Sequence, residues 1–235
     1  MNKDKLRQLF TFLATDESME AYAGTEEGKQ LIISAVPEAE TMFGYEQNSP
    51  WHEYELWTHT AKVLDGIDKR LNKELYEKLR IAAFFHDIGK PDTAMPKKTT
   101  DGSKHYSFPG HADQSALIAE PYLREMLQDP ADVEEIMFYI AAHDLFLNLR
   151  DDEKEAKRLQ INAVNIKRLM KRMKELYPEM PCRPLDFFRM MYLSQSDAAA
   201  HKRIVYEPDG TVKDTRRDMV HRTRMIRTII KEELM

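Results

Sequence analysis

The feature that constrains this chain most is the stretch at residues 81–90, IAAFFHDIGK. Its first five residues are apolar and typical of a buried helix, and they lead directly into His86 and Asp87. We expect Gly89 to end the helix in the left-handed conformation, with Pro91 preventing its continuation. His86 and Asp87 would then lie in the last helical turn, facing inward, where an imidazole and a carboxylate can share one divalent metal ion. The alternative is a packed core histidine beside an aspartate that binds no metal.

Composition favours helices over the whole chain. The 235 residues are enough for one large domain with its own core. Hydrophobic residues make up 42% and charged residues 32%, as in ordinary globular proteins. Leu, Met, Ala, Glu and Lys dominate, and only 8 glycines occur, which favours helix over sheet. We therefore predict an all-α helical bundle that forms a single domain over residues 1–235.

Three parts are expected within this domain. Residues 1–48 read as two short helices that cover the core, because apolar residues recur there at helical spacing. The core itself extends over about residues 35–205. A basic helix is predicted at about residues 211–235, with arginines at five of its positions.

Two segments depart from short amphipathic helices. The helical pattern stops between residues 93 and 108, where Asp101 and Gly102 favour a turn, so a small β-hairpin or loop excursion is predicted. Residues 151–177 are heavily charged with apolar residues at helical spacing. They are expected to form one long outer helix, or two, with a solvated face.

Four other predicted helices carry a polar residue on the inward face, among apolar neighbours at helical spacing. These residues are His59, His111, His143 and Asp197. Each histidine alone is more often a packed core residue than a ligand. Together with His86 and Asp87 they would cost about 1–3 kcal/mol each if buried without partners, and a shared metal centre removes that cost. Mixed imidazole and carboxylate donors suit Fe, Mn, Zn, Co or Ni, in one or two ions, and Mg²⁺ less well.

The order of these residues resembles the HD superfamily of metal-dependent phosphohydrolases, whose fold is all-helical. The matching succession is His59, then His86 with Asp87, then Asp197. The surrounding segments are similar to the HD domain of bacterial CCA-adding tRNA nucleotidyltransferases, at residues 50–60, 84–91, 106–111 and 196–198. The chain has no nucleotidyltransferase domain, so the resemblance covers about residues 35–205 and implies a hydrolase without polymerising activity.

The resemblance implies two groups of metal ligands. The first ion would be held by His59, His86, Asp87 and Asp197. His111 and His143 match the additional histidines of members that hold two ions, with Asp87 between them. His143 has an alternative role, because it could contact the substrate or hold a helix end.

Two residues are candidates for acting on the substrate. Lys90 follows the ligand pair and is placed to neutralise phosphate charge during catalysis; its alternative is a cation at a helix C-terminus. His52, in the loop before the first ligand helix, could donate to the substrate or the leaving group, or simply pack against a neighbouring tryptophan. Asp113, Lys104 and the C-terminal arginines are weaker candidates.

The expected function is a metal-dependent phosphohydrolase, either a phosphomonoesterase or a phosphodiesterase, that acts on a nucleotide or a cyclic phosphodiester through metal-activated water. One alternative is a non-catalytic module that binds a nucleotide or RNA, supported by the basic residues 201–203 and the later arginines. A structural protein with histidines stacked in its core and an HD-type oxygenase with two irons are further alternatives.

Charge and cysteine content limit the remaining classes. A formal charge of −5 argues against a general nucleic-acid binder, although local basic patches are compatible with it. The single cysteine, Cys182, cannot form an internal disulfide and fits a reducing compartment. The N-terminus has no apolar signal core and no apolar run is long enough to span a bilayer. We therefore expect a cytoplasmic protein without a membrane partner, while the oligomeric state stays open.

Overall fold

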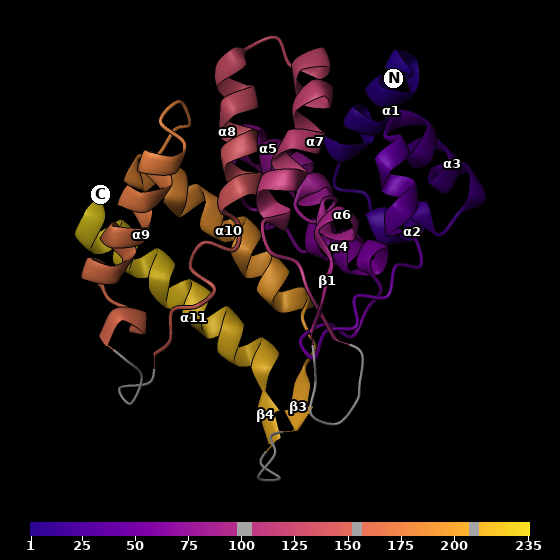
Figure 1. Cartoon of the computed structure of the whole chain (residues 1–235). Coiled ribbons are helices and arrows are strands. Elements are labelled where there is room, and N and C mark those ends of the chain that lie inside the picture. The colour runs from indigo at the N-terminus through magenta and orange to yellow at the C-terminus, as the bar shows by residue number, and fades with distance from the viewer. Residues whose placement is uncertain (98–104, 152–156, 207–211) are drawn as a thin grey trace.

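The computed structural model describes residues 1–97, 105–151, 157–206 and 212–235. Helices dominate this part of the chain, as the sequence predicts, and the all-α fold is confirmed (Figure 1). The α-helices are α1 (Lys3–Leu13), α2 (Met19–Ala23), α3 (Glu26–Ala35), α4 (Leu56–Asp65), α5 (Lys73–Phe85), α6 (Lys90–Thr93), α7 (His111–Met126), α8 (Pro130–Ala142), α9 (Ala163–Leu176), α10 (Pro184–Ala200) and α11 (Thr215–Ile229). The remaining helical turns are the 3-10 helices η1 (Pro37–Met42) and η2 (Lys157–Leu159) and the π-helix η3 (Ile230–Leu234).

Two short antiparallel strand pairs accompany the helices. Strand β1 (Met95–Lys97) pairs with β2 (His105–Ser107), with Met95 opposite Ser107, so the predicted excursion near residues 93–108 is confirmed. Its predicted turn at Asp101 and Gly102 lies outside the described residues. Strand β3 (Ile204–Tyr206) pairs with β4 (Val212–Asp214), and this second pair was not predicted. The β3–β4 pair lies below the helices in the view of Figure 1.

Local sequence explains where the principal helices begin. Asn72 caps α5 by accepting a hydrogen bond from the Leu75 amide, and Glu55 caps α4 by accepting from two amides of its first turn. These side chains satisfy amide groups that a helix start leaves without partners. Within α4, apolar residues recur every three or four positions, which turns His59 toward the core.

The core is centred on α5, which is buried along most of its length and contacts α4, α7, α8 and α10. The N-terminal segment covers one side of it through α1, α2, α3 and η1, so the expectation of only two short helices there is wrong. Arg80 of α5 joins the two parts, because its buried guanidinium donates to the carbonyl oxygens of Leu13 and Glu17, at 3.0 and 2.8 Å. The division into cover, core and C-terminal helix stays a prediction.

The C-terminal third decides between two alternatives that the sequence left open for residues 151–177. One long helix is wrong for their described part, which contains the turn η2, a β-bridge from Gln160 to Arg150, and then helix α9 from Ala163. The basic helix α11 packs along α10 with Met219 and Ile226 buried. It is therefore part of the packed structure as well as a charged surface.

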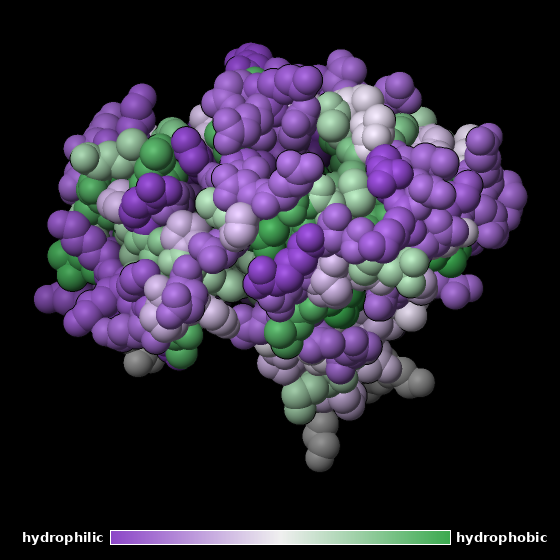
Figure 2. All heavy atoms as spheres, turned by 90° about the horizontal axis from the view of Figure 1, so that it is seen from above, coloured by the Kyte–Doolittle hydropathy of each residue, from purple (hydrophilic) through white to green (hydrophobic). Residues whose placement is uncertain are grey.

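Hydrophilic side chains cover most of the face seen from above, with smaller hydrophobic areas between them (Figure 2). Over the described residues, no helix combines the length and the hydrophobicity needed to span a bilayer.

Candidate metal centre

His86 and His143 occupy equivalent positions on neighbouring helices. Helix α5 ends at Phe85 and α8 at Ala142, so each histidine is the first residue after its helix. Helical spacing in the sequence predicts helices over about residues 73–88 and 131–147, and the structure ends both of them earlier. Both residues keep right-handed helical backbone angles, so their side chains still project as the next helical position would.

Gly89 does not have the left-handed conformation that the sequence predicts. Its φ is −83°, and a short helix, α6, begins at the next residue. The reason for a glycine here is the close approach of α7: an added Cβ would lie 2.7 Å from the Ser115 nitrogen and 2.8 Å from the His111 oxygen. The Gly89 amide also donates to Ser115 Oγ at 2.9 Å. Glycine thus allows α7 to lie against the turn that carries Asp87.

Three histidines of the site are held in the same way. In His86, His111 and His143, Nδ1 donates to the carbonyl oxygen three residues earlier, at 2.8, 2.8 and 2.7 Å. A carbonyl can only accept, so Nδ1 carries the proton and the neutral ring has its lone pair on Nε2. This is the arrangement by which proteins orient metal-binding imidazoles.

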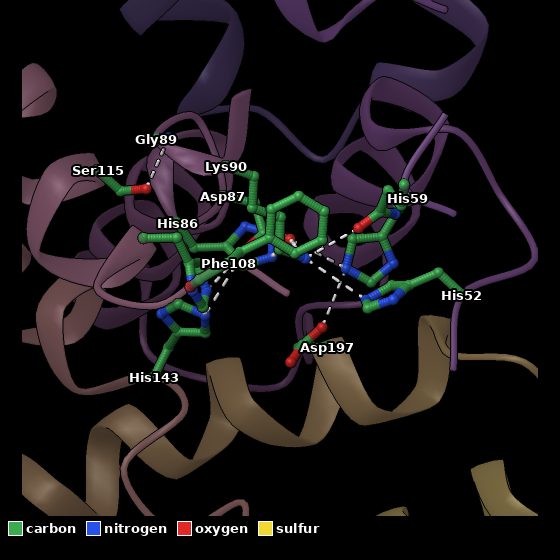
Figure 3. A network of polar contacts seen from close by, with 12 residues as sticks. His52, His59, His86, Asp87, Gly89, Lys90, Phe108, Ser115, His143 and Asp197 are labelled. Carbon is green, nitrogen blue, oxygen red and sulfur yellow. Dashed lines mark hydrogen bonds and ion pairs between the residues drawn. The ribbon is translucent and has the colours of Figure 1, made fainter. Parts of the chain in front are cut away.

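The first predicted ligand group comes together from α4, the end of α5 and α10 (Figure 3). His59 Nε2 lies 3.0 Å from Asp197 Oδ1 and 3.5 Å from Asp87 Oδ2, and His86 Nε2 lies 3.3 Å from Asp87 Oδ2. Donor atoms of His59, His86 and Asp197 all lie within 4.8 Å of one another. One ion could therefore contact all three.

The second predicted group lies on the opposite side of the Asp87 carboxylate. His111 Nε2 is 3.3 Å from Asp87 Oδ1, and His143 Nε2 is 3.8 Å from the same oxygen. Donor atoms of His86, Asp87 and His143 form a second set within 4.8 Å. Because Oδ2 faces the first group and Oδ1 the second, Asp87 is placed between two possible ion positions.

Several donor atoms of the site are buried without hydrogen-bond partners. This observation indicates that a metal ion fits among them. His59 Nδ1 and Nε2, His86 Nε2 and both carboxylate oxygens of Asp87 have no hydrogen bond, although Asp87 Oδ2 forms an ion pair with the Lys90 ammonium. The close contacts among them lack hydrogen-bond geometry, so these atoms face a common space. Buried polar atoms left unsatisfied cost about 1–3 kcal/mol each, and a divalent cation held among them would remove that cost. Imidazole and carboxylate donors match a divalent transition metal.

Burial and neighbouring charges set the protonation of the site. Burial lowers the pKa of His59 to about 4 and also lowers the pKa of His143. Burial opposes ionisation of Asp87, but His86 and Lys90 outweigh it and hold the pKa of Asp87 well below its ordinary value. For His86, burial is outweighed by the Asp87 charge, which raises its pKa. His59, His143 and Asp87 are therefore already in metal-binding protonation states at neutral pH.

Lys90 and His52 lie beside the first ligand group. The Lys90 ammonium is 2.6 Å from Asp87 Oδ2, donates to Gln47 Oε1 at 3.0 Å and lies over the Phe108 ring. The Lys90 side chain is buried, and Lys90 is the first residue of the short helix α6. His52 lies 3.4 Å from the Lys90 ammonium through Nε2. Gln47 and Phe108 were not recognised as site residues from the sequence.

His201 is a further site residue that sequence reasoning missed. It is buried, its Nδ1 donates to the Asp197 carbonyl at 2.8 Å, and its ring lies 4.6 Å from that of His52. From the sequence, His201 counted only as part of the basic residues 201–203, but its side chain is buried and faces the site instead. Its position four residues after Asp197, directly after the end of α10, was the available signal.

The weaker candidates lie elsewhere. Asp113 accepts a hydrogen bond from Tyr177 on the outer surface, and Lys104 lies outside the described residues. Among the described residues, a third group of carboxylates, at Glu74, Asp132 and Glu135, surrounds the Lys78 ammonium at 2.6–2.8 Å. That centre already holds its cation, so it is an ion-pair network.

Comparison with known proteins agrees with this geometry. A search of curated proteins finds no match. A sequence model of the HD domain matches residues 56–178, which is more than half of the chain and includes His59, His86, Asp87, His111 and His143. Asp197 lies beyond the matched segment. The chain belongs to the HD domain family.

Proposed function

We propose that this protein is a metal-dependent phosphohydrolase that cleaves a nucleotide or a cyclic phosphodiester. The observation that carries the proposal is the convergence of buried donor atoms from α4, the turn after α5 and α10 on one space, where those of His59 and His86 lack hydrogen-bond partners. HD domains are generally metal-dependent hydrolases, which supports the same reaction class. A stack of structural histidines would leave these atoms without partners, so it accounts for the site less well.

The metal would be held by His59, His86, Asp87 and Asp197, with His111 and His143 available for a second ion. An ion held there would supply a Lewis acid that polarises a phosphoryl oxygen and makes hydroxide available near neutral pH. The mixed nitrogen and oxygen donors favour Fe, Mn, Zn, Co or Ni over Mg²⁺.

The chain's own groups have separate tasks. Lys90 is a buried cation whose ammonium would compensate phosphate charge while it keeps Asp87 ionised. His52 is close enough to the ammonium to contact a substrate oxygen bound there. Burial lowers the pKa of His52 well below its ordinary value, so at neutral pH it is an uncharged ring able to accept or donate one hydrogen bond.

A nucleotide-like substrate is the finer part of the proposal. The motif likeness to the HD domain of CCA-adding tRNA nucleotidyltransferases supports it. A screen of nucleotides and cyclic phosphodiesters, supplemented with each candidate metal, would identify the preferred ester.

The central experiment combines metal analysis with one substitution. Purified protein should contain a transition metal, and removing it with a chelator should abolish phosphate release. Asp87→Asn, which keeps the side-chain shape, and Asp87→Ala should each lose metal and activity together. Asp16→Ala, which changes an exposed aspartate outside the site, should keep both. Full activity in metal-free protein, or full metal content in the Asp87 variants, would refute the mechanism.

A further inference from the structure

A basic surface groove lies beside the candidate metal centre. It is formed by the end of α10, the β3–β4 pair and the first half of α11, and its volume is about 850 Å³. Its charged lining consists of Arg203, Arg216, Arg217 and Arg224 with Asp214 and Asp218. Arginines therefore exceed aspartates two to one here, although the whole chain carries a formal charge of −5. The groove lies beyond the segment that the HD domain matches.

Two of these arginines are available to a ligand. Arg203 lies 3.6 Å from Asp214, and Arg216 pairs with Glu53 at 2.7 Å. Arg217 and Arg224 are exposed, and their side chains have no ion pair or hydrogen bond among the described residues. They lie seven residues apart on α11, or about 10 Å along its axis. A guanidinium presents a planar fork of donors that matches a phosphate group.

The groove shares a wall with the metal centre. Arg216, which lines the groove, donates through Nε to the His201 carbonyl at 2.7 Å, and His201 in turn contacts Asp197. On the same side, the Lys202 amide donates to the Trp51 carbonyl at 2.8 Å. Trp51 is 48% exposed and directly precedes His52. The backbone of Trp51, a residue with an exposed side chain, is thus joined to the segment that leads from His201 into the groove.

We propose that the groove binds the sugar–phosphate backbone of a single-stranded nucleic acid, with a base stacked on Trp51 at the entrance to the metal centre. Spaced arginines together with an exposed aromatic ring are the two elements by which proteins bind single strands without reading sequence. A single strand fits better than a duplex, because stacking on the exposed Trp51 ring requires an unpaired base. The claim that the bound strand is also hydrolysed rests on the proposed function. The claim that it binds in the groove does not.

The test measures binding without turnover. Chelator-treated full-length protein is titrated into a fluorescein-labelled 12-nucleotide oligouridylate, and anisotropy is followed at several salt concentrations. Arg217→Ala/Arg224→Ala should weaken binding at least tenfold at low salt and reduce the salt slope by about 1.4, from two phosphate contacts on a single strand. Trp51→Ala should weaken binding fivefold or more.

A matched control removes two positive charges elsewhere. Lys167→Ala/Arg172→Ala changes two exposed residues of α9 and should leave affinity and salt slope as in the wild type. Equal binding by the groove variant and the wild type would overturn the proposal. Competition by polyglutamate as strong as that by unlabelled oligouridylate would also overturn it, and would assign the groove to an acidic peptide.

The two proposals fail in different ways. Hydrolysis of bis-p-nitrophenyl phosphate by metal-loaded wild-type protein, with oligouridylate binding absent, removes the groove assignment alone. Oligouridylate binding that depends on Arg217, Arg224 and Trp51, with hydrolysis of every phosphodiester absent, removes the proposed hydrolase and leaves the groove as a binding site.

Discussion

Gly89→Ala tests whether the contact between α7 and the turn after α5 holds the metal centre together. The new Cβ would lie 2.7–2.8 Å from three atoms, of which the Ser115 nitrogen and the His111 oxygen belong to the backbone. Real Cβ atoms are essentially never found within 3.0 Å of such atoms, so α7 must move away from the turn. Overpacking of this kind typically costs about 1–3 kcal/mol.

The movement also weakens a buried hydrogen bond. The Gly89 amide donates to Ser115 Oγ, which is fully buried, and this bond contributes about 1 kcal/mol. We therefore expect the free energy of unfolding to fall by about 2–4 kcal/mol. Because His111 begins α7 and Asp87 lies two residues before Gly89, the same movement should lengthen their 3.3 Å contact and lower metal affinity.

Urea denaturation of metal-free protein measures the first effect, and calorimetric titration with Mn²⁺ or Zn²⁺ the second. Gly44→Ala is the matched control: Gly44 has a φ of +71°, but its Cβ would meet nothing within 4 Å. It should cost about 1–2 kcal/mol through backbone strain and leave metal affinity unchanged. If Gly89→Ala lost less than about 0.5 kcal/mol and bound metal like the wild type, the close approach would not be what positions His111.

Three further predictions concern single side chains. Below pH 6.5 the unfolded chain protonates His59, but the folded chain does not until about pH 4, so the unfolding free energy of metal-free protein should fall by up to about 3 kcal/mol as the pH is lowered across this window. His59→Asn should flatten that part of the pH profile measured by urea denaturation, and an unchanged slope would contradict the assignment. Arg80→Met should lower the free energy of unfolding by about 3 kcal/mol or more, because the carbonyls of Leu13 and Glu17 lose a buried charged donor. Limited proteolysis of this variant should cut first within the N-terminal helices, and initial cleavage elsewhere would count against this. Lys90→Ala should lower kcat/KM about 100-fold while metal content stays full, and Lys90→Arg is the control that conserves the charge. A loss of metal from Lys90→Ala would instead make Lys90 a structural residue.

Much of the site was predictable because helical periodicity determines which residues share a face. His59 and Asp197 alternate with apolar residues at three- and four-residue spacing, and the structure buries both. The prediction needed no tertiary information, since a polar residue on an apolar face already indicates an inward direction. The same reasoning missed Gln47, which reaches Lys90 from a non-helical loop without periodicity.

Helix ends and glycine roles were predicted less well, because neighbouring elements decide them. The motif His-Asp-Ile-Gly-Lys suggested a left-handed glycine, whereas the structure uses Gly89 to admit α7. Nothing local in the sequence distinguishes these two uses. The irregular start of α9 likewise depends on the bridge between Arg150 and Gln160, which are ten positions apart.

The position of Asp197 shows how distant packing completes what the local motif begins. A shift of one residue along α10 would rotate its side chains by about 100° and turn Asp197 away from His59. Two serines that precede it in α10 prevent this: Ser194 Oγ donates to the His143 carbonyl and Ser196 Oγ to the Val63 carbonyl, each at 2.6 Å. These bonds fix α10 against the helices that carry the other ligands. Asp197 lies outside the matched HD segment, so its place in the site depends on this register and not on the motif around His86.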